Sequence, residues 1–123
     1  MHRVVIGLSL ALLTANVAMA GELLPLRHGL YVDVQAACAD RGDATTLSYY
    51  GNGIGAAQVT NDDTIVSHRG NVYRLRSTMT ENANPGSVTV GHETITVLSR
   101  TKFKFEGGYG QATYRWCVAS GPP

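Results

Sequence analysis

The residues of this chain that could do acid–base or metal chemistry are few and widely spaced. Beyond residue 20 the histidines are His28, His68 and His92, without the close i, i+2 or i, i+4 spacing that places two metal ligands on one face. Asp62 and Asp63 could orient His68 as a base, but the nearby hydroxyls lack the turn that exposes a catalytic nucleophile. We therefore expect no metal site, no cofactor and no enzyme activity, and a hydrolase built on these three residues is the least favoured hypothesis.

Two other stretches resemble ligand loops only superficially. The sequence Asn61-Asp62-Asp63 lacks the alternating oxygens, central glycine and distal glutamate of a calcium loop. The glycine-rich stretch 51–55 lacks the lysine and the following helix of a phosphate-binding loop. We interpret 60–63 as a solvated turn and Gly51-Asn52-Gly53 as a hairpin turn.

Six basic residues could gather on one face of a sheet, because residues two apart on a strand share a face. This candidate binding face comprises Arg74, Arg76, Arg100, Lys102, Lys104 and Arg115. Adjacent strands would turn it into a surface for an anionic partner, such as another exported protein with an acidic surface. The competing interpretation is ordinary solvation, with Glu81, Glu93 and Glu106 neutralising the cations on the same face.

Three tyrosines are candidate recognition groups in loops. Tyr49 and Tyr50 precede the glycine turn, and Tyr109 lies within a second glycine-rich loop at 107–110. Exposed tyrosines bind partners well because they cover a large area while few rotamers are lost. Alternatively, these rings fold back over the end of the domain and join the core.

Residues 1–20 have the pattern of a secretory signal peptide. Arg3 precedes an apolar run at 4–13, and Ala18-Met19-Ala20 forms a small-x-small cleavage site. The apolar run is too short to span a bilayer. We expect one β domain at 21–119, a flexible tail at 120–123 and no stable membrane anchor after cleavage. Ten Lys and Arg oppose nine Asp and Glu, so removal of Arg3 leaves nine of each and no bulk charge that favours nucleic acid.

The cysteines, Cys38 and Cys117, are the two in the chain. Export would place them where disulfides form and persist, and no C-x-x-C motif suggests a metal or redox site. We expect a structural disulfide between them. The loop it closes spans 79 positions in the sequence, for which the chain-entropy model gives roughly 4 to 5 kcal/mol.

Short strand patterns recur along residues 31–118 without a helical period. In one of them Tyr73, Leu75 and Met79 share a face while Arg74 and Arg76 share the other. The candidate strand segments are 31–35, 45–50, 54–59, 64–67, 72–79, 88–90, 94–98, 102–105 and 112–118, separated by turns that include 60–63, 81–87 and 91–93. About seven or eight strands predict an all-β fold, a small antiparallel sandwich or barrel.

The stretches LPLRHGLYVDVQAACAD, ATTLSYYGNGI and FKFEGGYGQATYRWC resemble those of a group of small exported proteins of proteobacteria. The resemblance covers most of residues 21–123 and implies a β-rich envelope protein, with no catalytic residue to carry over. It also implies that an apolar pair near Val59 and Met79 stands in for a second cysteine pair. Cys38 and Cys117 would then be the surviving outer bridge.

These features favour a non-catalytic binding protein of the bacterial envelope, periplasmic or secreted. Its loops or basic face would engage another protein, as an inhibitor or an immunity-type partner does. The alternative is a barrel that binds a small ligand or a polysaccharide, which requires an interior cavity on the order of several hundred Å³.

Overall fold

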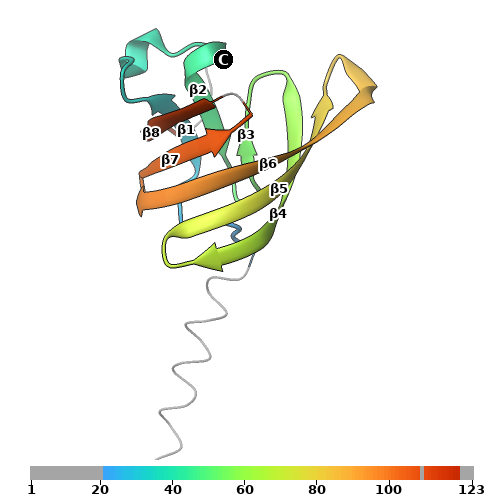
Figure 1. The fold of residues 1–123 in the computed structure, drawn as a ribbon. Helices are drawn as coiled ribbons and strands as arrows, with labels where there is room; N and C mark the ends of the chain where they lie inside the picture. The colour runs from blue at the N-terminus through green and yellow to red at the C-terminus, as the bar shows by residue number, and fades with distance from the viewer. Residues whose placement is uncertain (1–20, 109, 120–123) are drawn as a thin grey trace, which may run out of the picture.

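The computed structural model describes residues 21–108 and 110–119. The predicted signal peptide at 1–20, the tail at 120–123 and Tyr109 lie outside the described residues. The described chain forms strands and two short 3-10 helices (Figure 1), which are, in order, β1 Gly29–Asp33, η2 Cys38–Asp40, η3 Asp43–Thr45, β2 Thr46–Tyr49, β3 Ile54–Gly55, β4 Val59–Arg69, β5 Val72–Glu81, β6 Asn84–Ser99, β7 Lys102–Gly107 and β8 Gly110–Val118.

The eight strands form one antiparallel sheet that curves almost into a closed barrel (Figure 1). Their order is β3-β2-β1-β8-β7-β6-β5-β4, and each neighbouring pair is antiparallel. The two outermost strands, β3 and β4, meet at the seam, where the Ile54 N–H donates to Asp63 Oδ2 at 3.0 Å. The predicted all-β fold is confirmed, and its form is the barrel.

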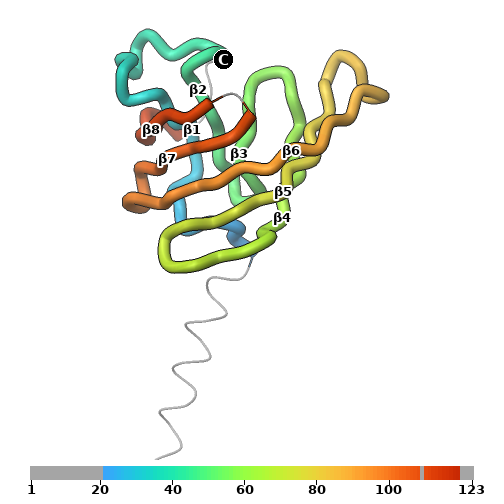
Figure 2. The backbone as a smooth tube through the Cα atoms, viewed as in Figure 1, coloured from blue at the N-terminus to red at the C-terminus, as the bar shows by residue number. Residues whose placement is uncertain are grey.

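Large apolar side chains fill one end of the barrel. Leu24 and Leu26, from the segment before β1, are buried together with Tyr31, Tyr49 and Phe103. Figure 2 shows this segment, in blue, at the lower end of the barrel near the β4–β5 hairpin. The Leu24 N–H donates to Tyr49 Oη at 2.9 Å, and the Tyr49 hydroxyl donates to the Leu24 carbonyl at 2.8 Å. The segment before β1 therefore closes this end as a fixed plug.

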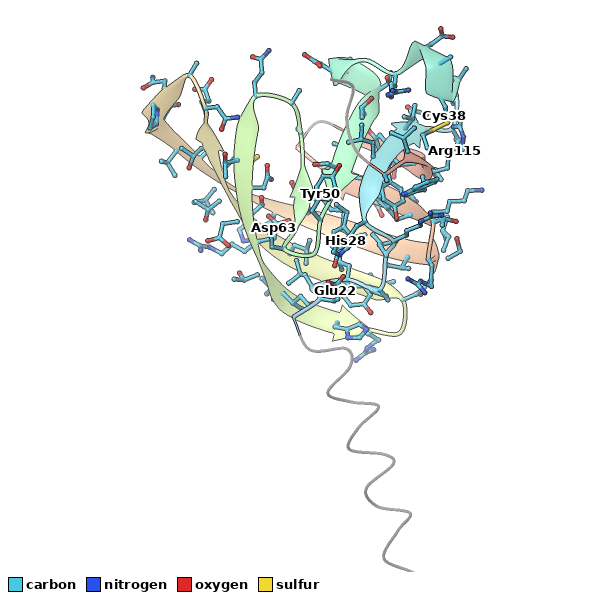
Figure 3. All side chains as sticks on the ribbon, turned by 180° about the vertical axis from the view of Figure 1, so that it is seen from behind. Glu22, His28, Cys38, Tyr50, Asp63 and Arg115 are labelled. Carbon is cyan, nitrogen blue, oxygen red and sulfur yellow. A yellow bond between two sulfur atoms is a disulfide. The ribbon has the colours of Figure 1, made fainter. Side chains whose placement is uncertain are left out.

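A disulfide fastens the β1–β2 connection to the outer face of β8. Cys38 and Cys117 are bonded, with their Cα atoms 5.7 Å apart, as predicted. The Arg115 guanidinium, beside this bond in Figure 3, donates to the carbonyls of Asp33 at 3.1 Å and Ala36 at 2.7 Å. A charged donor and a covalent bond thus hold the same connection in place.

The turn predicted at 60–63 is wrong, because β4 continues through it. Asn61, Asp62 and Asp63 pair with Met79, Thr78 and Ser77 of β5 in an unbroken register. Asn and Asp favour turns because their side chains can bond to nearby backbone. In β4 the ladder to β5 outweighs that local preference, and the Asp63 carboxylate bonds instead to the backbone of β3.

The break predicted at 91–93 is also wrong. Gly91, His92 and Glu93 pair with Ser77, Arg76 and Leu75 of β5, so the two predicted short strands are one strand, β6. The turn predicted over 81–87 is confined to residues 82 and 83. The long ladder between β5 and β6 overrides the local turn signals.

Loss of the disulfide should cost the fold several kcal/mol. A variant with Cys38→Ala and Cys117→Ala should unfold at lower urea, with a loss approaching the roughly 4 to 5 kcal/mol expected for this loop. Urea titrations of wild type with and without reductant give the comparison: reductant should lower wild-type stability by a similar amount and leave the variant unchanged. A variant as stable as the oxidised wild type would show that the remaining contacts hold the connection by themselves.

Candidate functional site

A cavity of about 520 Å³ lies within the barrel, at the end away from the leucine plug. Its wall takes residues from all eight strands and from η3, and its mouth lies beside the connection that the disulfide fastens. Leu47, Ile54, Met79, Phe105 and Tyr114 provide much of its apolar surface. The chamber is therefore shaped by the whole sheet and not by a single loop.

Glu93 is the most unusual residue of this wall. It points inward from β6 and is 7 % exposed, and its Oε1 has no hydrogen-bond partner in the described part of the chain. A Cβ on Gly107 would lie 3.0 Å from the Phe105 ring and 3.4 Å from Glu93 Cγ, so glycine leaves room for both side chains. Burial, and secondly the charge of Asp63, raises the pKa of Glu93 to about 7.

Asp63 also points inward, from β4. It is 5 % exposed, and burial raises its pKa against the opposing effect of the Ser77 hydroxyl and the Ile54 N–H. Gly53 is required beside it, because its φ is +147° and a Cβ there would lie 2.6 Å from Asp63 Oδ2. Two interior carboxyl groups, Asp63 and Glu93, thus resist ionisation in a shared low-dielectric space.

Further acceptors line the cavity without partners. Asn61 uses its amide nitrogen to donate to Ser77 Oγ at 2.9 Å. Its Oδ1 and the Thr46 Oγ1 are buried and, like Glu93 Oε1, have no partner among residues 21–108 and 110–119. Such oxygens cost free energy unless a donor reaches them.

The charged groups of the wall are all acidic. Asp33 and Asp43 accompany Glu93, and within the described lining there is no lysine, arginine or histidine. Concave walls of one charge sign concentrate the field inside a cleft. The cavity consequently favours positively charged or hydrogen-bond-donating groups.

The predicted basic face is divided in the structure. Lys102 lies opposite Arg115 on the neighbouring strand, but β6 separates Arg74 and Arg76 from the β7 lysines. Arg115 is half-buried and bonded to backbone carbonyls. Lys104 Nζ lies 3.9 Å from Glu106 Oε1, and Arg100 is exposed after the end of β6.

Glu93 was expected among the neutralising carboxylates of that outer face, and this expectation is wrong. Its position on β6 has the same parity as Ile95, which is fully buried, and Val97, which packs against the core. Period-two pleating through 91–97 would have placed Glu93 inside. The predicted break at 91–93 concealed this signal.

The predictions for the three candidate recognition tyrosines have different outcomes. Tyr49 is fully buried, so its assignment as a recognition group is wrong; it belongs to the core, as the alternative proposed. Tyr50 is 47 % exposed, and its hydroxyl donates to the Ala119 carbonyl at 3.2 Å. Tyr109 lies outside the described residues.

The histidines lie away from the cavity carboxylates. His28 Nε2 is 2.8 Å from Glu22 Oε1, near the plugged end (Figure 3). His68 stacks on Tyr73, with 3.9 Å between ring centroids, and its Nε2 is 2.7 Å from the Gly70 carbonyl. His92 is exposed on β6. Among the described residues, no group of three or more His, Cys, Asp or Glu side chains is placed to hold a metal ion.

Val59 and Met79, where the resemblance implies a lost cysteine pair, both line the cavity.

Comparisons with known proteins return no matching family model, curated protein or solved structure. In the part of the chain that the structure describes, no helix has the length and apolar character needed to cross a bilayer.

Glu93 should make the protein less stable as the pH rises from about 4.5 to about 7. Its ordinary pKa is 4.5 and its folded pKa about 7, so between these values the folded state binds more protons than the unfolded state. The free energy of unfolding should fall by roughly 2 to 3 kcal/mol across this range. Urea titrations at several pH values measure it.

The variant Glu93→Gln should remove this decline and be more stable than wild type at pH 8. The matched control is Glu106→Gln, because Glu106 lies on the outer face of the neighbouring strand and its variant should keep the wild-type profile. Asp63 contributes in the same direction in all three proteins. Because its charge is coupled to that of Glu93, the difference between the profiles measures Glu93 together with this coupling. Identical profiles for wild type and Glu93→Gln would contradict the assignment.

Proposed function

We propose that this protein is a non-catalytic binding protein that holds a small ligand inside its barrel. The observation that carries the proposal is the cavity of about 520 Å³, which lies within the range of small-molecule sites in proteins. Its wall combines an apolar majority with a few placed polar groups, as such sites do. Of the two binding hypotheses, the ligand barrel therefore has the better structural support.

Two features of the mouth support a preformed site. The connection that carries Asp43 to the rim is held by the disulfide and by Arg115. A fixed mouth reduces the ordering cost of binding. The disulfide is also compatible with the oxidising compartment that the predicted signal peptide implies, and we propose a periplasmic or secreted location.

The outer basic face supports its own hypothesis less well. An anionic protein partner would need Arg115 and the lysines of β7 to act together, but Arg115 already binds backbone carbonyls. Lys104 is close to Glu106. The role of inhibitor or immunity-type partner stays a prediction without a specific supporting contact.

The cavity can be tested with N-phenyl-1-naphthylamine, an uncharged apolar fluorophore. Its emission should rise on binding to wild type, and Ala112→Trp should weaken binding by about tenfold or more, because Ala112 lines the cavity. The matched control is His92→Trp, which adds the same ring at an exposed position on β6.

Fluorescence titration of the three proteins, with unfolding curves to show that each is folded, decides the result. Binding that Ala112→Trp weakens and His92→Trp leaves intact supports the proposal. The absence of saturable binding, or equal binding by all three folded proteins, would overturn it.

A further inference from the structure

We propose that the ligand carries a protonated amine, and that the Glu93 carboxylate inside the barrel is its counter-ion. This inference rests on the proposed ligand-binding function and specifies the chemical class of the ligand. The apolar part of the ligand would pack against Leu47, Met79 and Phe105, which line the same cavity.

Several buried oxygens of the cavity wall lack a hydrogen-bond partner among the described residues. The buried atoms without partners along the wall include Glu93 Oε1, Asn61 Oδ1 and Thr46 Oγ1. Above about pH 7, where Glu93 is ionised, its oxygens can only accept, as the Asn61 amide oxygen does, so the ligand group that satisfies them must donate. An ammonium group has three donors and no acceptor, and hydrogen bonds to charged groups are the stronger ones.

The burial of Glu93 also bears on the charge of the ligand. Glu93 is 7 % exposed, and the described lining supplies no cationic side chain to pair with it. An unpaired buried charge is costly, whereas a paired and hydrogen-bonded one is tolerated. A bound cation would neutralise the charge of the ionised carboxylate, which a neutral or an anionic ligand cannot do.

Organic amines fit this wall better than a divalent metal ion. Hard divalent cations prefer six or more oxygen ligands or several waters, but Asp63 Oδ2 already accepts the Ile54 N–H. Much of the remaining wall is apolar. An amine with a hydrophobic body uses both the carboxylate and that apolar surface.

The other titratable groups near Glu93 do not compete for this role. Asp63 faces it from β4 and raises its pKa through like charge. Asp33 and Asp43 lie at the rim and would attract a cation toward the mouth. Tyr114, on β8, has a pKa that burial raises above its ordinary value, so its hydroxyl stays neutral at physiological pH.

Three naphthalene ligands of the same shape test the inference by competition with N-phenyl-1-naphthylamine. They are 1-naphthylmethylamine, 1-naphthylmethanol and 1-naphthoate, which are cationic, neutral and anionic at pH 8. We expect the amine to displace the fluorophore about tenfold or more better than the alcohol, and the carboxylate to compete least. In wild type the advantage of the amine should shrink at pH 5.5, where Glu93 is protonated.

The variant Glu93→Gln should abolish the advantage of the amine while the alcohol and the fluorophore still bind. The control Glu106→Gln should retain it. Binding of the fluorophore itself shows that each variant is folded with an intact cavity, and the wild-type pH series tests the same point without a substitution.

Each negative result bears differently on the two proposals, the cavity and the amine. If the fluorophore binds but the amine and the alcohol compete equally in wild type, the cationic ligand is excluded and the cavity proposal stands. If calcium chloride displaces the fluorophore while the amine competes no better than the alcohol, the site prefers a metal ion and the amine proposal is overturned. If the fluorophore does not bind, the proposed function fails and this inference fails with it.

Discussion

The contact between the Asp63 carboxylate and the Ile54 backbone amide closes the sheet on itself. Strand β3 has two residues, Ile54 and Gly55, too few for a ladder that could hold an eight-stranded sheet in a ring. A side chain from β4 therefore supplies the bond that a backbone carbonyl would otherwise supply. Gly53 lets the carboxylate approach. Without this seam the interior would be one face of an open sheet, and its buried polar groups would be solvated.

The two ends of the enclosed interior have different contents. Toward the N-terminal segment, leucines and aromatic rings pack closely, and the Tyr49 hydroxyl satisfies both backbone groups of Leu24. Toward the disulfide, smaller and polar residues leave space. Filling one end while leaving the other open gives the barrel a stable base and a chamber. In small barrels, interior side chains decide whether the centre is solid or holds a ligand.

The two buried carboxyl groups, Glu93 in the cavity wall and Asp63 at the seam, carry a cost in stability because they are buried. Both side chains have raised pKa values because burial disfavours their charged forms, and the charge of Asp63 raises the pKa of Glu93 further. An apolar residue at position 93 would pack without this cost. Buried, unsatisfied ionisable groups in a cleft are typical of functional sites, where stability is exchanged for a prepared electrostatic environment. The disulfide and the leucine plug offset this loss elsewhere in the fold.

Local patterns in the sequence determined the fold class and the covalent link. Alternation along 72–79 and the spacing of turns were sufficient to predict an antiparallel β fold. With two cysteines and a predicted export signal, a single intramolecular disulfide was the expected link. Tertiary structure alone decided the course of β4 and β6, because cross-strand ladders overrode turn-forming residues at 60–63 and 91–93. It also placed Asp63 and Glu93 inside and Tyr49 in the core. The alternation through 91–97 assigns Glu93 to the inner face only if β6 runs unbroken through Gly91. The cross-strand ladder decides that continuity, and closure of the sheet turns the inner face into an interior.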